Sequence, residues 1–246
     1  MSTINLGGAV VLVTGANGGL GTEFVNQALA RGASKVYATA RTPKDWGDER
    51  VVALQLDVTD PASVAAAAAA ATDVTVVINN AGVSTGASLT APDLAATRVI
   101  FETNFFGPLE VANAFAPVLK ANGGGALLNV LSVLSWIALG DAYSATKAAL
   151  WSASNTQRLA WAGDGILVTS LYLGYTDTPM TVGVDAEKND PADVVRAAYD
   201  GLVAGEYEVL ADEVSRQVKA GLSAPVSALY PQLDPQRAGM TATRTG

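Results

Sequence analysis

The 246-residue sequence contains neither cysteine nor histidine. The absence of cysteine excludes a disulfide framework, a thiolate nucleophile and cysteine-ligated metal sites. The absence of histidine excludes Ser-His-Asp hydrolysis and the usual zinc centres, so we expect no metal site. Any proton transfer must therefore use Tyr, Lys, Asp, Glu or Ser side chains.

Charge and long apolar runs are also scarce. Charged residues make up 15% of the chain, and the net charge is −8 without a basic cluster that would attract nucleic acid or an anionic membrane. The longest uninterrupted apolar run, residues 64–71, is too short to span a bilayer. The opening residues, MSTINLGG, show no secretory pattern. We expect a cytoplasmic protein that binds neither membranes nor nucleic acid.

The sequence does contain a regular alternation of apolar runs and amphipathic stretches. Runs rich in Val, Ile and Leu predict strands at residues 9–13, 35–40, 51–56, 74–78, 126–131, 166–171 and 207–210. Helical patterns lie between them at residues 20–31, 61–72, about 92–120, 141–162 and 191–203. Continuous apolar runs are typical of strands that are buried on both faces, as in a parallel sheet.

This alternation predicts an α/β protein with a doubly wound parallel sheet, the Rossmann fold, in a single domain over residues 1–246. The small polar residues at 238–246 should be frayed. In such a sheet, ligands bind outside the carboxyl ends of the strands. The polar residues that follow each predicted strand are therefore the candidates for function.

The stretch TGANGGLG, residues 14–21, follows the first predicted strand and opens the first predicted helix. Glycines at 15, 19 and 21 permit a tight turn, close approach of a pyrophosphate and close helix–strand packing. The helix N-terminus adds free N–H groups and the positive end of its dipole. A glycine-rich turn without a ligand is the alternative that this stretch alone leaves open.

Two further clusters follow later strands. NNAG, residues 79–82, comes after the fourth predicted strand, and AYSATKAAL places Tyr143 and Lys147 four residues apart on one helical face. Ser132 lies at the end of the fifth strand, and Asn104 lies inside the long predicted helix. A Tyr–Lys pair at this spacing is common on helix surfaces, but these residue types are the ones that proton transfer without histidine requires.

In this order, the motifs resemble those of the short-chain dehydrogenase/reductase family over nearly the whole chain. TGANGGLG is similar to that family's Thr-Gly-x-x-x-Gly-x-Gly, NNAG to its Asn-Asn-Ala-Gly, and YSATK to its Tyr-x-x-x-Lys. LGYTDTPM, residues 173–180, is similar to its Pro-Gly-x-x-x-Thr segment, with Leu173 in place of the proline. The segment between Ser132 and Tyr143 is slightly shorter than usual, which leaves Ser135 as an alternative to Ser132.

The resemblance implies an oxidoreductase that interconverts a carbonyl compound and an alcohol by hydride transfer with a nicotinamide dinucleotide. Tyr143 would be the general acid in reduction and the base in oxidation. Lys147 and an oxidised nicotinamide should lower the pKa of Tyr143, and Lys147 would also hold the nicotinamide ribose. Ser132 would bind the substrate oxygen. Asn104 would kink its helix and anchor a water for proton relay to Lys147.

The resemblance also divides the chain into a mainly cofactor-binding half, residues 1–125, and a catalytic and substrate-binding half, residues 126–246. The implied cofactor contacts, besides Tyr143 and Lys147, are Gly15, Asn17, Gly19, Leu20, Gly21, Arg41, Asp57, Val58, Asn80, Ala81, Gly82, Gly174, Thr176 and Thr178. An apolar, fairly open substrate pocket with few charged side chains is expected, beside a short lid segment. It should be lined by Val83, Leu134, Trp136, Ile137, Leu139, Tyr175 and Met180.

The end of the second predicted strand indicates which dinucleotide is used. Enzymes that prefer NAD usually carry an acidic residue there, whereas this chain has Ala40 followed by Arg41. A guanidinium can donate a charge-assisted pair of hydrogen bonds to a 2′-phosphate. Gly18 provides no second basic contact. We therefore expect a moderate preference for NADP (NADPH), with NAD less favoured.

The two long predicted helices, about 92–120 and 141–162, carry apolar residues on more than one face, which predicts a homodimer or homotetramer. These residues include Phe101, Phe105, Phe106, Leu150, Trp151, Leu159 and Trp161. Three alternative functions remain open because a fold does not determine a function. They are a sugar-nucleotide epimerase, a halohydrin-dehalogenase-like lyase and a nucleotide-sensing regulator.

Overall fold

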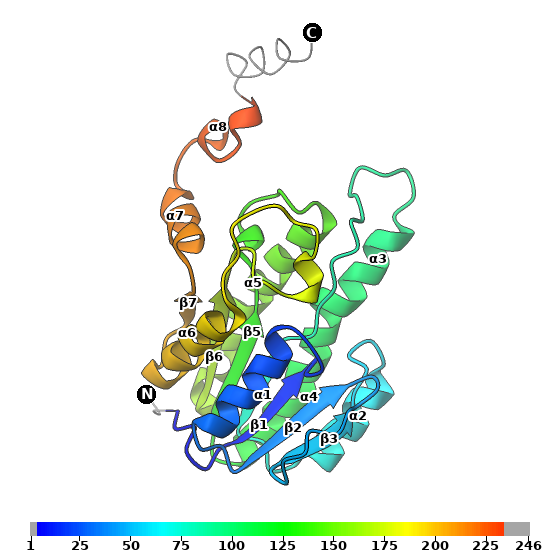
Figure 1. Ribbon diagram of the computed structural model, residues 1–246, viewed down its shortest axis with the longest axis vertical. Coiled ribbons are helices and arrows are strands. Elements are labelled where there is room, and N and C mark those ends of the chain that lie inside the picture. The colour runs from blue at the N-terminus through cyan, green and yellow to red at the C-terminus, as the bar shows by residue number, and fades with distance from the viewer. Residues whose placement is uncertain (1–3, 234–246) are drawn as a thin grey trace.

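The computed structural model describes residues 4–233, which form one seven-stranded sheet with helices on both faces (Figure 1). The spatial order is β3-β2-β1-β4-β5-β6-β7, and every neighbouring pair is parallel. The predicted single-domain Rossmann fold is thereby confirmed. The strands are β1 Val10–Thr14, β2 Lys35–Ala40, β3 Val51–Gln55, β4 Val76–Asn79, β5 Gly125–Val130, β6 Ile166–Tyr172 and β7 Glu208–Leu210.

Helices connect the strands, and local sequence explains where several of them begin. The Asp60 and Asp190 side chains accept hydrogen bonds from the N–H groups of Ala62 and Ala192, and a proline follows each aspartate at the first helical position. The helices are α1 Leu20–Ala30, α2 Pro61–Ala70, α3 Ala95–Phe101, α4 Gly107–Ala121, α5 Ala142–Trp161, α6 Pro191–Ala204, α7 Glu213–Gly221 and α8 Val226–Leu229.

The core lies in two layers, one on each face of the sheet. On one face, α1 and α6 pack together, and the Tyr199 hydroxyl donates to the carbonyl of Phe24 at 2.8 Å. On the other face, α2 and α4 cover the sheet around the fully buried Phe115. The expectation of strands buried on both faces fails for β3, whose side chains are exposed or half-buried, because β3 is an edge strand.

The helix expected at about 92–120, with a kink at Asn104, is observed as a continuous helical segment over residues 95–121. It consists of α3, a π-helical turn Glu102–Phe106 and α4. Helices α7 and α8 were not predicted, and they extend away from the sheet beyond β7 (Figure 1). Within the described part of the chain, no helix combines the length and the apolar character needed to cross a membrane. The expected fraying at 238–246 concerns residues outside the described range.

Candidate active site

A cleft of about 1600 Å³ lies at the carboxyl ends of the strands. Three of the predicted site residues, Gly21, Asn104 and Trp136, do not line it. The others do: Gly15, Asn17, Gly19, Leu20, Arg41, Asp57, Val58, Asn80, Ala81, Gly82, Val83, Ser132, Leu134, Tyr143, Lys147, Gly174, Tyr175, Thr176, Thr178 and Met180. The fold therefore brings almost the whole predicted set to one cleft.

The glycine turn forms one end of this cleft. Gly15 and Gly19 have φ angles of 66° and 53°, a region that side chains other than glycine rarely adopt. The Asn80 amide donates to the carbonyls of Thr14 and Gly15 at 2.9 and 3.2 Å, which holds β1 against the segment after β4. No side chain caps α1 at Gly19, and the Gly21 N–H donates to the Gly18 carbonyl at 3.0 Å, so no side-chain acceptor competes with an anionic ligand for the other N–H groups at this helix start.

Gly21 has a packing role rather than a place in the cleft wall. It is buried in the first turn of α1, and a Cβ atom there would lie 2.1 Å from the Gly15 carbonyl oxygen. Only glycine allows the helix to begin this close to the turn. The turn therefore fits the pyrophosphate of a dinucleotide, with backbone N–H groups and no competing side chain.

The polar residues of α5 face the middle of the cleft. The Lys147 ammonium donates to the Val130 carbonyl at 2.7 Å and lies 5.6 Å from the centre of the Tyr143 ring. Lys147 is 4% exposed, so its charge is held almost completely out of water. The expected juxtaposition of tyrosine and lysine on one helical face is present in the structure.

Burial, rather than Lys147, dominates the acidity of Tyr143. Burial raises the pKa of Tyr143 to about 12, and the neighbouring Ser132 hydroxyl acts in the opposite direction. Burial also lowers the pKa of Lys147 to about 8. The expected lowering of the tyrosine pKa by Lys147 is therefore not observed, because the pKa shifts upward and burial is the main cause. The phenol stays protonated at neutral pH.

The structure separates the roles of the two serines. Ser132 lines the cleft, and its Oγ accepts from the Leu134 N–H at 3.1 Å and donates to the Leu173 carbonyl at 3.4 Å. Ser135 is buried outside the cleft, and its Oγ accepts from the Ser132 N–H at 3.3 Å. Ser135 therefore stabilises the turn that contains Ser132. Ser132 lies beside Tyr143, as expected.

Asn104 lies behind the cleft wall in the π-helical turn and is completely buried. Its Oδ1 accepts from the Val83 N–H and its Nδ2 donates to the Val83 carbonyl, both at 2.8 Å. Nδ2 also lies 3.3 Å from the Thr146 hydroxyl on α5. The predicted irregularity of this helix is observed, and it ties the segment after β4 to the helix that carries Tyr143 and Lys147.

The assignment of Trp136 to the substrate pocket is wrong. Its ring stacks on Tyr172 with centroids 4.1 Å apart, and the Lys219 ammonium of α7 lies 5.2 Å from its ring centre. These contacts pull the indole toward β6 and α7. Ile137 and Leu139 of the same segment line the cleft, as expected.

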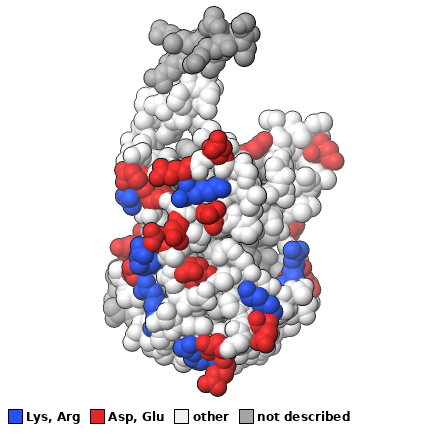
Figure 2. Space-filling model, in the orientation of Figure 1, with Lys and Arg blue, Asp and Glu red and all other residues white. Residues whose placement is uncertain are grey.

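The expectation of few charged side chains in the pocket is also wrong. Several charged side chains reach the cleft from segments that are distant in sequence, so no local pattern predicted that they line it. Besides Arg41, Asp57 and Lys147, the charged residues that line the cleft are Glu102, Glu187, Lys188, Asp212 and Glu213. Figure 2 shows acidic side chains gathered over the upper part of this face with a basic group between them.

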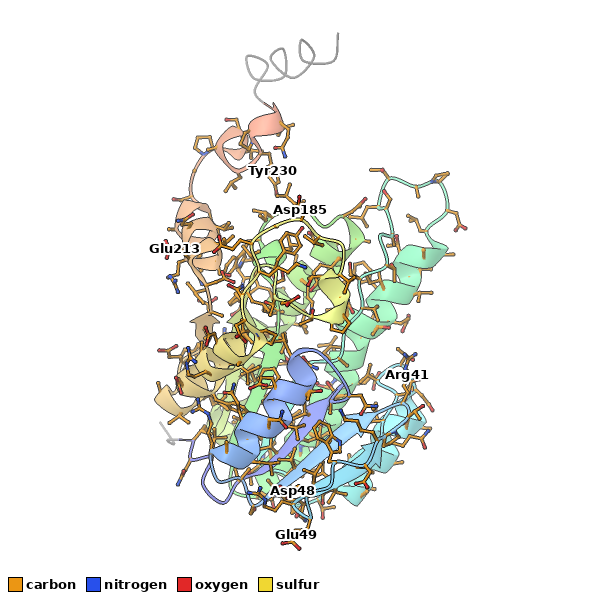
Figure 3. The ribbon with its side chains drawn as sticks, in the orientation of Figure 1. Arg41, Asp48, Glu49, Asp185, Glu213 and Tyr230 are labelled. Carbon is orange, nitrogen blue, oxygen red and sulfur yellow. The ribbon has the colours of Figure 1, made fainter. Side chains whose placement is uncertain are left out.

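Arg41 and Asp57 mark the other end of the cleft. Arg41 is exposed just beyond β2, and Figure 3 shows it across the molecule from Glu213 on α7. Asp57 Oδ1 accepts from the N–H and the hydroxyl of Thr59 at 3.0 and 2.8 Å, and these bonds lower the pKa of the carboxyl. This carboxylate is thus charged and oriented, as an acceptor for an adenine amino group must be.

Sequence reasoning missed Lys44 at this end. The Asn17 side chain donates to the Thr42 carbonyl at 2.7 Å, and the Lys44 ammonium donates to the Asn17 carbonyl at 3.4 Å. The loop after β2 is therefore folded onto the glycine turn, with a second cation beside it. A basic residue shortly after Arg41 was the available signal.

Comparison with known proteins identifies the family of the chain. The family model described as short chain dehydrogenase matches residues 9–189. The chain belongs to this family of dinucleotide-dependent oxidoreductases. The cis-4-hydroxycyclohexanecarboxylate dehydrogenase of Sinomonas cyclohexanicum is 33% identical over 193 residues, which cover 72% of this chain and 77% of that protein.

Two solved structures extend the likeness. A short-chain dehydrogenase from Burkholderia cenocepacia J2315, in complex with NADP, is 38% identical with a TM-score of 0.87, covering 94% of this chain and 100% of that chain. An NADPH-bound carbonyl reductase from chicken fatty liver is 27% identical with a TM-score of 0.75, covering 85% of this chain and 96% of that chain.

Proposed function

We propose that this protein is an NADPH-dependent carbonyl reductase, which also catalyses the reverse alcohol oxidation. The observation that carries the proposal is the convergence of Ser132, Tyr143 and Lys147 on one cleft that begins at a glycine turn open to phosphate. NADPH supplies the hydride when bound. The NADP and NADPH complexes of the two solved relatives support this choice of cofactor.

The protein's own residues then handle the oxygen and the proton. The Ser132 hydroxyl holds the substrate carbonyl oxygen, and Tyr143 Oη donates its proton to that oxygen as it gains negative charge. Tyr143 is protonated at neutral pH, as an acid in reduction must be. The buried Lys147 ammonium holds the ribose hydroxyls of the nicotinamide half and adds positive charge near the reacting oxygen.

The cleft walls favour a neutral carbonyl compound with a bulky apolar or aromatic body. Leu134, Ile137 and Leu139 supply apolar surface, and the Glu187 carboxylate disfavours an anionic substrate, whereas Glu213 is paired with Arg216 at 2.8 Å. The test is the rate of NADPH oxidation with aromatic ketones, aldehydes, quinones and anionic keto acids. Preference for small keto acids would overturn the substrate assignment, and failure of the whole panel would favour a non-redox or regulatory function.

The proposed preference for NADPH over NADH depends on the charged residues near the adenosine 2′-phosphate, which gives a testable prediction. Arg41→Ala should raise the KM for NADPH about tenfold or more and leave that for NADH nearly unchanged, because a charge-assisted contact contributes roughly 1.5–3 kcal/mol. Lys44→Ala should have a smaller effect in the same direction. Ala40→Asp should turn the preference toward NADH, since a carboxylate there repels a 2′-phosphate.

Arg50→Ala is the matched control, because Arg50 pairs with Asp48 away from the cleft lining and should leave both constants unchanged. Both constants are measured by steady-state kinetics at one ionic strength, since exposed charges are screened by salt. Equal catalytic efficiencies with NADPH and NADH in the unmutated protein would refute the proposed selectivity.

We also propose a homodimer or homotetramer. Leu159 on α5 is 84% exposed and Phe106, the last residue of the π-helical turn before α4, is 46% exposed, whereas Leu150 is buried within the chain. The rings of Phe101, Phe105 and Phe106 form an edge-to-face series, so the exposed phenyl group continues an apolar surface. Light scattering at micromolar concentration measures the mass, and a monomer would overturn this proposal.

A further inference from the structure

A buried carboxylate outside the family motifs lies at the base of the segment after β6. Asp212 precedes the first residue of α7, is 8% exposed and caps that helix by accepting from the Ser215 N–H at 2.8 Å through Oδ1. Its Oδ2 accepts from the Gly174 N–H at 2.6 Å and from the Asn189 side-chain amide at 2.7 Å. One carboxylate thus joins three separate segments of the chain.

Two of these segments are the ends of a single loop. The Asn189 N–H donates to the Tyr175 carbonyl at 2.8 Å, and the Asp177 N–H donates to the Asn189 carbonyl at 3.0 Å. Thr176 and Asn189 therefore form an isolated parallel β-bridge. The residues between them form a loop that contributes Thr178, Met180 and Glu187 to the cleft.

Asp212 fits this position because it is charged and offers acceptors only. Three N–H donors converge on its two oxygens, and these bonds hold the pKa of the carboxyl below its ordinary value despite its burial. An asparagine there would turn an NH₂ group toward at least one of the three donors. A Cβ atom on Gly174 would lie 3.4 Å from Oδ2, so the carboxylate sits close against the backbone of this segment.

We propose that Asp212 is a positioning residue that fixes the loop after β6, and through it the nicotinamide side of the cleft, against α7. The inference rests on the proposed function for the identity of the ligand at Gly174, Thr176 and Thr178. Asp212 is the residue before Glu213, which Figure 3 shows across the molecule from Arg41, and both Asp212 and Arg41 line the cleft. Its loss should therefore weaken binding of the nicotinamide half without affecting the adenosine half.

The test compares Asp212→Asn with Asp193→Asn, which removes an exposed carboxylate on α6 that pairs with Arg196. Asp212→Asn should raise the Kd for NADPH about tenfold or more and lower kcat, because a buried charge-assisted network is broken. Binding of adenosine 2′,5′-bisphosphate should stay unchanged. Asp193→Asn should resemble the unmutated protein in all three measurements. Equal weakening of both ligands, or of neither, would overturn the proposal.

A second measurement needs no cofactor and so separates this proposal from the proposed function. Hydrogen exchange of residues 173–189 in ligand-free protein should accelerate in Asp212→Asn, while exchange in β2 stays unchanged. Asn189→Ala removes one of the three donors without leaving a buried charge unpaired, and should produce the same local change in smaller degree if Asp212→Asn does not fold. Unchanged exchange at 173–189 in the folded variants would refute the positioning role even if NADPH proves to be the wrong ligand.

Discussion

Replacing Tyr143 with phenylalanine is expected to lower kcat for carbonyl reduction by about 100- to 10,000-fold, the usual contribution of a general acid. The substitution removes only the phenolic hydroxyl, while the ring, the α5 backbone and the Lys147–Val130 contact remain. The Kd for NADPH should therefore change little. Single-turnover kinetics and fluorescence titration with NADPH measure the two quantities separately.

Two variants control this experiment. Tyr207→Phe changes an exposed tyrosine at the edge of β7, outside the cleft lining, and should leave kcat unchanged. Lys147→Ala should damage both kcat and NADPH affinity, because the ammonium has both a binding and an electrostatic role in the proposed mechanism. Appreciable reductase activity in Tyr143→Phe would show that the proton comes from another group.

Replacing Lys147 with methionine is expected to change how the stability of the protein depends on pH. In the folded state burial lowers the pKa of Lys147 from 10.5 to about 8, so below pH 8 the fold contains an unfavourably buried charge. Between these two values the unfolded chain binds more protons than the folded one, and stability rises with pH. Relative to Lys147→Met, the unmutated protein should gain about 3 kcal/mol of unfolding free energy from pH 7 to pH 10.5.

Denaturant unfolding of ligand-free protein across this pH range gives the difference directly, and other titrating groups cancel between the two proteins. Lys120→Met is the matched control, since Lys120 is 63% exposed and pairs with Asp164 at the surface. That variant should run parallel to the unmutated protein. A constant difference between Lys147→Met and the unmutated protein would mean that the lysine is solvated in the folded state.

Burial of the Lys147 ammonium lowers the stability of the folded protein at neutral pH. Lys147 is almost inaccessible to water, and Tyr143 loses much of the solvation that a phenolate needs. Both shifts disfavour the charged forms, so the fold stores an ammonium at neutral pH against its own stability. We expect the loss of stability to be offset in catalysis, because a desolvated charge acts more strongly on a reacting oxygen than a hydrated one.

Much of the fold could be predicted from the sequence because its signals are local. The apolar runs found all seven strands, and the observed ends differ from the predicted ones by at most two residues. The glycines at 15, 19 and 21 are required by backbone geometry in their own turn, which makes them recognisable without knowledge of the rest. The spacing of Tyr143 and Lys147 likewise defines a single helical face.

The remaining features depend on contacts between residues far apart in sequence. The π-helical turn at Asn104 exists where that amide meets Val83 and Thr146, and no pattern of apolar residues within the helix distinguishes it from a regular turn. Trp136 packs outside the cleft because its ring stacks on Tyr172 and contacts the Lys219 ammonium.

The sequence by itself thus determined the sheet, the glycine turn after β1 and the family of the protein, since each rests on residues that are neighbours in the chain or on one element. Tertiary structure decided the pKa of Tyr143, the set of charged side chains that line the cleft and the hydrogen bonds that converge on Asp212. Burial and solvation are properties of the whole packed chain, and Asp212 meets Gly174 across 38 positions of sequence. Such contacts leave no local pattern, because the folded sheet alone brings the two segments together.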